Sequence, residues 1–181
     1  MLAGMNLELI EEADMTPETD AAIKRLLCAC FPPDVDAFSK SRHWHGSAPA
    51  YTVLQRDAND VVGQVGVVLR TVRVGDRQVD IAGIQSLAVD PDLQGSMLAW
   101  ALMRRCMREA KSRGVPFGIL FCVPELETLY AAMRWQTVEV NVTMAFEGRH
   151  QPIPGKNICM VLDLGGGEWP QGDIDLQGPD W

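Results

Sequence analysis

The chain has 181 residues, of which 47% are hydrophobic, and a formal net charge of −8. These values exclude a disordered chain and favour one domain with its own core. The acidic balance disfavours nucleic acid, and no apolar run reaches the roughly 20 residues of a membrane span. The sequence also lacks a signal-peptide pattern, and its five cysteines are scattered. We therefore expect a cytoplasmic protein with reduced thiols, no membrane association and no metal site.

Hydrophobic periodicity predicts the elements of the first half of the chain. Thr16 is a helix N-cap and Pro17 occupies the first helical position. The expected elements are a strand over 6–11, a helix over 17–30, a short helix near 35–41, and strands over 51–56, 61–74 and 78–89. The three later strands are separated by turn residues, which predicts an antiparallel meander.

The second half changes to a helical period after Pro91. The expected elements are a long helix ending at Gly114, a buried strand over 115–122, a second helix around 126–133, and strands over 137–146 and 157–164. The strand over 115–122 is short and apolar, as is typical of a strand parallel to its neighbour. Residues 1–164 are expected to form one domain. Residues 165–181 are acidic and rich in Gly and Pro, and we expect them to be a tail docked on that domain.

The most informative segment is the junction between the strand ending at Val89 and the long helix. Here Pro91 makes a turn and the small residues Gly95 and Ser96 precede the helix. Free backbone amides at a helix start bind anions, and glycine permits a close approach. A diphosphate would fit at this junction; the alternative is an ordinary junction between a strand and a helix, where small residues are common.

This junction resembles the signature of the Gcn5-related N-acetyltransferase (GNAT) superfamily, Leu-x-Val-x-Pro-x-x-(Arg/Gln)-x-x-Gly-x-(Gly/Ala). The matching positions are Leu87, Val89, Pro91, Gln94 and Ala99, whereas Met97 stands in place of the middle glycine. The resemblance implies an α/β (α+β) fold: a mixed, mostly antiparallel sheet of six to seven strands, splayed between two parallel strands and flanked by about four helices. It implies acetyl-CoA or another acyl-CoA bound at Leu87, Ala88, Val89, Gln94, Gly95, Ser96, Met97, Leu98 and Ala99.

A second segment, Leu129-Tyr130-x-x-x-Arg134-Trp135, is similar to the Tyr-x-x-x-Gly-(Phe/Trp) segment of the superfamily, with Arg134 in place of glycine. The resemblance implies direct acyl transfer to an amine. Tyr130 is our candidate for the acid that protonates the departing thiolate; the alternative is a tyrosine that only packs between helix and sheet. We expect Cys122 to line a pocket or the core rather than act as a nucleophile.

Two narrower likenesses suggest different acceptors. Residues 104–121 and the tail from Trp169 to Asp180 look like the rhizobial nodulation N-acyltransferases, which attach a fatty acyl group to a chito-oligosaccharide amine. Tyr130, Trp135, Met97 and the ending Asp180-Trp181 are similar to aminoglycoside 2′-N-acetyltransferases, whose acidic C-terminus helps to bind a polycationic sugar. We favour acetyl-CoA and a small cationic aminosugar. A long-chain nodulation-type transfer and a non-catalytic acyl-CoA-binding module are the alternatives.

Six residues are predicted to contact the amine acceptor: Trp44, His45, Gln85, Cys122, Asp180 and Trp181. Trp44 has the equal alternative of covering the edge of the core. The general base is left open among His43, His45, Asp80, Glu125 and a water held by Gln85. Because dimers are common in the superfamily, a homodimer is a further expectation.

Overall fold

The computed structural model describes residues 6–44, 46–153 and 157–181. The chain divides into two compact units. The first contains residues through 68, residues 85–108 and Trp181, and the second contains 69–84 and 109–180. Two long strands, β3 (Asp60–Val74) and β4 (Arg77–Val89), contribute residues to both units.

The first unit is built on an antiparallel sheet in which β2 pairs with both β1 and β3. Its elements are β1 (Leu7–Glu11), α1 (Pro17–Cys30), α2 (Val35–Phe38), β2 (Tyr51–Asp57), parts of β3 and β4, and most of α3 (Leu98–Ser112), with short 3₁₀ turns at Glu12–Asp14, Pro32–Asp34 and Pro91–Leu93. The predicted start of α1 is confirmed, because the Thr16 side chain accepts a hydrogen bond from the Thr19 amide at 3.2 Å.

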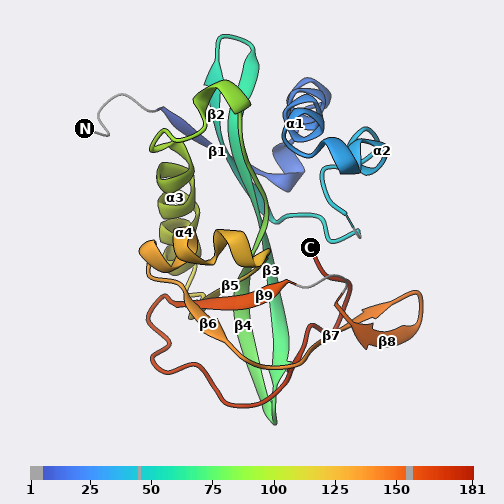
Figure 1. Ribbon diagram of the computed structural model, residues 1–181, viewed down its shortest axis with the longest axis vertical. Helices are drawn as coiled ribbons and strands as arrows, with labels where there is room; N and C mark the ends of the chain where they lie inside the picture. Colours follow the sequence, from blue (N-terminus) through green and yellow to red (C-terminus); the bar gives the residue numbers. More distant parts are fainter. Residues whose placement is uncertain (1–5, 45, 154–156) are drawn as a thin grey trace. The chain divides into compact units, whose positions relative to one another are not determined.

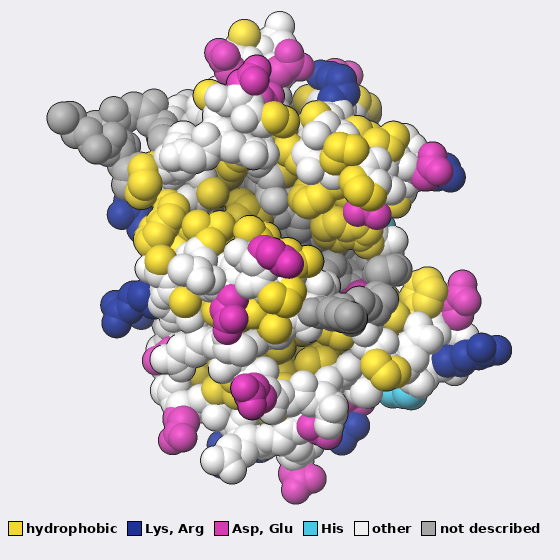
Figure 2. Space-filling model, in the orientation of Figure 1, with side chains coloured by type: hydrophobic (Ala, Val, Ile, Leu, Met, Phe, Trp, Pro, Cys, Tyr) yellow, Lys and Arg dark blue, Asp and Glu magenta, His cyan; other side chains and the backbone are white. Residues whose placement is uncertain are grey.

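Helices cover both faces of this sheet (Figure 1). On one face, Ile23 and Leu27 of α1 are completely buried in a cluster that includes Leu54 of β2. On the other face, a Cβ atom on Gly63 would lie 2.8 Å from the Leu98 side chain of α3. The glycine therefore lets α3 approach the sheet. Hydrophobic side chains also remain at the surface over α1 and α2, where Val35 is 41% exposed (Figure 2).

The second unit contains the remaining strands and α4. Its elements are β5 (Phe117–Cys122), the 3₁₀ turn Pro124–Leu126, α4 (Glu127–Ala132), β6 (Gln136–Val138), β7 (Val142–Phe146), β8 (Arg149–Pro152), β9 (Ile158–Asp163) and β10 (Ile174–Asp175). The strand order is β6-β9-β5-β4-β3-β10-β7-β8. As predicted, β4 and β5 are parallel, with Ile81 paired to Phe117. β6 is at one end of this order and β7 is next to the other end, yet only residues 139–141 connect them. Because three residues span only about 10 Å, the sheet must curl to bring the two strands together.

The predicted fold class is confirmed, although several elements differ from expectation. Among the described residues, the sheet contains ten strands, whereas six or seven were expected. The single strand expected over 137–146 is wrong, because β6 pairs with β9 whereas β7 pairs with β8 and β10. The β7–β8 hairpin turns at Glu147 and Gly148, both with positive φ, a conformation typical of a tight hairpin turn. The short helix α2 ends at Phe38 rather than near Ser41, and α3 begins only at Leu98.

Part of the C-terminal tail is a strand of the second unit. β10 lies between β3 and β7, antiparallel to the first and parallel to the second. Ile174 is 1% exposed and Leu176 is fully buried. Beyond them, the Arg70 guanidinium donates to the Pro179 carbonyl at 2.6 Å, and a Cβ atom on Gly178 would lie 3.1 Å from that guanidinium. The tail is therefore part of the packing of this unit.

We expect Leu176→Ala to reduce the free energy of unfolding by about 2–5 kcal/mol, because it leaves a cavity in the core. Urea denaturation followed by circular dichroism measures this loss. The matched control is Val123→Ala, at a side chain that is 46% exposed; we expect it to stay within about 0.5 kcal/mol of the native protein. Equal stability of the two variants would contradict the structural role of the tail.

Candidate active site

The middle of β4 is distorted. Ser86 has a φ of 50°, an unusual conformation for a residue other than glycine inside a strand. The buried Gln64 side chain donates a hydrogen bond to the Ser86 carbonyl. The neighbouring Gln85 is 1% exposed, so its amide also requires a partner within the protein.

That partner belongs to the connection between α2 and β2. We call its residues 42–44, 46 and 47 the β4 loop, because they include the residues bonded to β4. Gln85 Nε2 donates to the Ser47 carbonyl at 2.8 Å, and Ser86 Oγ donates to the Arg42 carbonyl at 3.4 Å. The Arg42 side chain is mostly buried and forms ion pairs with Glu12 and Asp20, the latter at 2.7 Å. The β4 loop is therefore bonded to β4 at both of its ends, through Arg42 and Ser47. No motif in the sequence marked Arg42 or Gln64 for this role.

The predicted site residues of the β4 loop have different surroundings. His43 Nδ1 accepts a hydrogen bond from the Gly46 amide at 3.0 Å. Burial, followed by the charge of Arg42, lowers the pKa of His43, so the neutral ring is favoured. The Trp44 ring lies 4.7 Å from the Phe38 ring, against the core, which favours the packing alternative for this residue. His45 lies outside the described residues.

The turn before α3 contains Gly95 and Ser96. Gly95 has a φ of 79°, and a Cβ atom placed on it would have no neighbour within 4 Å. Some of the expected amides are already used: Ser96 N donates to the Leu93 carbonyl at 3.2 Å and Leu98 N to Ser96 Oγ at 3.3 Å. Met97 is 50% exposed. The turn is therefore open at Gly95, but it has fewer uncommitted amides than the sequence suggested.

In the second unit, β5 ends at Cys122 and leads through a short turn to α4. Cys122 is 5% exposed, and burial, with a further contribution from Glu127, raises its thiol pKa to about 11. The thiol is therefore protonated at neutral pH and unsuited to nucleophilic attack. Tyr130 is also buried, at 6% exposed, and its ring lies 6.5 Å from that of Trp135 in an edge-to-face arrangement.

Arg134 adopts the left-handed conformation, with a φ of 73°. It stands where the related segment has glycine, and it follows the end of α4, where a left-handed residue commonly terminates a helix. The next amide, of Trp135, donates back to the Tyr130 carbonyl at 3.1 Å. The backbone at this position thus adopts the left-handed conformation that glycine favours, although the residue is an arginine.

Several acidic groups of the tail are occupied within the second unit. Asp175 pairs with Arg73 at 2.8 Å, and Asp173 accepts from the Asn141 amide at 3.1 Å. Just before the tail, at the end of β9, Asp163 accepts from the Gly165 amide at 2.7 Å. Asp180 is 8% exposed. Burial lowers the pKa of Arg70, and the negative charge of Asp180 opposes this shift. The tail acids therefore stabilise their own unit, and only some of their charge is available to a ligand.

The predicted site residues divide between the two units. Trp44, Gln85, Trp181 and residues 87–99 belong to the first, whereas Cys122, Tyr130 and Asp180 belong to the second. Gln85, which was expected to hold a water that acts as the base, donates to Ser47, and the candidate base Asp80 accepts a hydrogen bond from the Thr71 hydroxyl.

Two further properties concern ligands and membranes. Within residues 6–44, 46–153 and 157–181, no three His, Cys, Asp or Glu side chains come together as a metal site would require. None of the helices in those ranges has the length and hydrophobicity needed to cross a bilayer.

The family model for nodulation protein A (NodA) matches residues 4–181, so the chain belongs to the NodA family. The nodulation protein A of Bradyrhizobium elkanii is 29% identical over 160 residues, covering 79% of this chain and 74% of the relative. That of Rhizobium leguminosarum bv. trifolii is 24% identical over 142 residues, covering 76% and 64%.

Solved structures identify the fold. A GNAT family acetyltransferase from Brucella melitensis in complex with acetyl-CoA has a TM-score of 0.60 and 18% identity, with 94% of this chain and 95% of the other covered. The GNAT family N-acetyltransferase YhbS from Escherichia coli in complex with CoA has a TM-score of 0.62 and 17% identity, with 96% and 91% covered. The predicted GNAT superfamily, the nodulation likeness and the N-acyltransferase class are confirmed.

We expect Arg134→Gly to raise the free energy of unfolding by about 1 kcal/mol, because glycine adopts the left-handed conformation without a steric cost. Arg134→Ala is the control, since it removes the same exposed side chain but keeps a Cβ atom. Thermal or urea denaturation of the two variants compares them. Stabilisation of both to the same extent would assign the effect to the lost charge instead of the backbone.

Proposed function

We propose that the protein transfers a long-chain acyl group from a coenzyme A-type thioester to the primary amine of a chito-oligosaccharide-like aminosugar. The observation that carries this proposal is the NodA family match across residues 4–181. That span includes the 87–99 junction, Tyr130 and the tail. The likeness to aminoglycoside acetyltransferases rested on a few single residues, whereas the family match covers nearly the whole chain.

Residues of the first unit fit the donor. When bound, the thioester supplies an activated acyl carbonyl. By resemblance, the backbone of Leu87–Val89 holds the pantetheine arm and the turn 94–99 holds the diphosphate. The open space at Gly95 supports this assignment. The 15-residue helix α3 begins at this turn, so its dipole favours an anion there.

The reaction requires the amine nitrogen to attack the acyl carbon. A C–N bond forms and the C–S bond breaks, the amine loses a proton to a base or water, and the departing sulfur gains one. We assign that last proton to the Tyr130 hydroxyl, whose buried position on α4 excludes much of the solvent. Cys122 takes no covalent part, because its raised pKa keeps it a thiol.

Amide formation tests the function directly. We expect the purified protein to release free thiol from dodecanoyl-CoA in the presence of chitosan oligomers, and mass spectrometry should show one added dodecanoyl group. Fully N-acetylated chitin oligomers are the control, since they lack the free amine. Thioester binding without thiol release, across a panel of amines, would instead identify a non-catalytic binding module.

Replacing Tyr130 tests the proton donor. We expect Tyr130→Phe to bind the thioester normally but to lower kcat at least about tenfold, as for the loss of a general acid. The chain's only other tyrosine provides the control. Tyr51 is fully buried and donates to the Cys106 carbonyl at 2.9 Å, so Tyr51→Phe should cost about 1 kcal/mol of stability with little change in kcat. Unchanged turnover in Tyr130→Phe would remove this residue from the mechanism.

A further inference from the structure

The carbonyl group of Ser86 is bonded to a side chain of the neighbouring strand β3. The side-chain amide of Gln64 donates to it, and Gln64 is 3% exposed. Both residues belong to the first unit, as does Leu87–Val89, the segment that we assign to the donor. Just beyond this segment, the Asp90 amide donates to the Val62 carbonyl of β3 at 2.9 Å. Bonds to β3 therefore hold the chain on both sides of Leu87–Val89.

The bond from Gln64 also fixes the direction of the next backbone amide. The carbonyl and the N–H of a trans peptide point in opposite directions. The described residues contain no cis peptide bond. Because the Ser86 carbonyl points toward Gln64, the N–H of Leu87 points away from Gln64. The direction of the first amide in the donor segment thus depends on a side chain of another strand.

This direction needs support, because Ser86 does not favour its own conformation. Its φ of 50° is costly for a residue with a Cβ atom. A return to the negative φ of an ordinary strand would move the carbonyl away from Gln64. The buried side-chain amide would then lose this acceptor, which is also costly. The hydrogen bond from Gln64 therefore stabilises the unusual backbone and the amide direction together.

The direction of a backbone amide matters for acyl transfer. When the amine attacks, the acyl oxygen of the thioester gains negative charge. A backbone N–H that is held in advance beside this oxygen stabilises the charge, and the loss of one such donor lowers kcat about 100-fold or more. A residue that holds the amide can thus control turnover without touching the donor.

We propose that Gln64 is a positioning residue, which directs the Leu87 amide toward the acyl oxygen of the donor through its bond to the Ser86 carbonyl. The proposal rests on the proposed function, because it concerns the same donor. Gln64 transfers neither a proton nor the acyl group. Its loss should therefore lower kcat but leave the binding of the donor nearly unchanged.

Kinetics of Gln64→Met test the proposal, because methionine has a similar length but no hydrogen-bond donor. We expect kcat with dodecanoyl-CoA and chitosan oligomers to fall at least about tenfold. The thioether S-dodecyl-CoA does not react, so calorimetry can measure its dissociation constant. We expect this constant to stay within about threefold of the native value, since the proposed contacts of the coenzyme are kept. An unchanged kcat would overturn the proposal.

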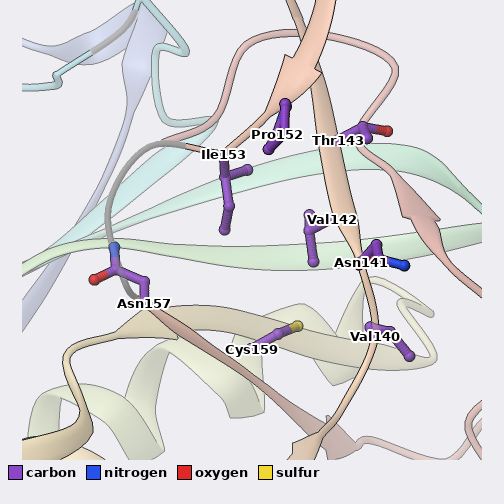
Figure 3. A pocket seen from close by; sticks show the side chains of 8 residues that line it. All are labelled: Val140, Asn141, Val142, Thr143, Pro152, Ile153, Asn157 and Cys159. Carbon is purple, nitrogen blue, oxygen red and sulfur yellow. The ribbon is translucent and has the colours of Figure 1, made fainter.

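Two control variants remove comparable bonds elsewhere. Gln55→Met removes the bond from the Gln55 amide to the Arg56 carbonyl, at 2.8 Å on β2. Thr143→Val acts in the second unit, where the Thr143 hydroxyl donates to the Ile174 carbonyl at 3.4 Å and points away from the pocket shown in Figure 3. We expect both to keep the native kcat, and circular dichroism verifies that all variants fold. A fall in both controls equal to that in Gln64→Met would assign the effect to stability and overturn the proposal.

A carboxyl group at this position gives a second readout. In Gln64→Glu, the protonated carboxyl can donate to the Ser86 carbonyl, whereas the ionised carboxyl cannot. We expect the ratio of kcat in Gln64→Glu to native kcat to rise toward one as the pH falls through the pKa of the introduced carboxyl. If the ratio at low pH stays as small as in Gln64→Met, a restored donor does not restore turnover, and the proposal is overturned.

A ligand that cannot react separates this proposal from the proposed function. In a ketone analogue of dodecanoyl-CoA, a methylene replaces the thioester sulfur, so the acyl group cannot be transferred. An isotopic label on its carbonyl carbon lets NMR detect a hydrogen bond to the oxygen as a downfield shift. We expect a smaller shift on binding to Gln64→Met than on binding to the native protein or to Gln55→Met.

The outcomes of this measurement are distinct. Equal shifts in the native protein and in Gln64→Met would overturn the positioning role, even if amide formation supports the proposed function. If no donor yields an amide, the proposed function fails, yet the comparison of shifts still decides the role of Gln64. A native protein that does not bind the ketone at all would overturn both proposals.

Discussion

Hydrogen bonding at the distorted middle of β4 is the constraint on which much of the first unit depends. A non-glycine residue with positive φ is costly in a strand and persists only when its surroundings hold it. Here Gln64 donates to the Ser86 carbonyl, and Gln85 donates to Ser47 of the β4 loop. The amide groups of these two buried side chains thereby have partners, and the loop is fixed to the strand that precedes the turn before α3. Removing either of them would leave buried polar groups without partners.

In the second unit, the corresponding constraint is the position of β10. A two-residue strand is a weak element by itself, but this one pairs on both sides, with β3 and β7. The buried Ile174 and Leu176 add apolar contacts, and Arg70 binds the carbonyls that follow. The order of the strands, and with it the position of β7, thus depends on residues 174–179.

The two glycines that the GNAT-like segments lack have different consequences. At Arg134 the backbone adopts the glycine-like conformation despite the side chain, so the shape of the segment around Tyr130 is retained. At Met97 the side chain is half exposed beside the turn that the diphosphate would occupy. We expect the first departure to affect stability, and the second to affect the surface that the proposed donor would meet. These two departures from the motif therefore cannot be treated as equivalent losses of function.

The sequence by itself determined the elements whose signals are local. Thr16 and Pro17 mark the start of α1, and the apolar period over 17–30 gives its length. The parallel pairing of β4 and β5 follows from a short apolar strand after a long helix. The family resemblance rested on the same contiguous segments. Only the tertiary structure decided that 137–146 is broken into two strands, because the partners of β7 include a strand about thirty residues later. It also decided the attachments of Gln85 and Arg42, since burial and long-range pairing have no local signature in a single sequence.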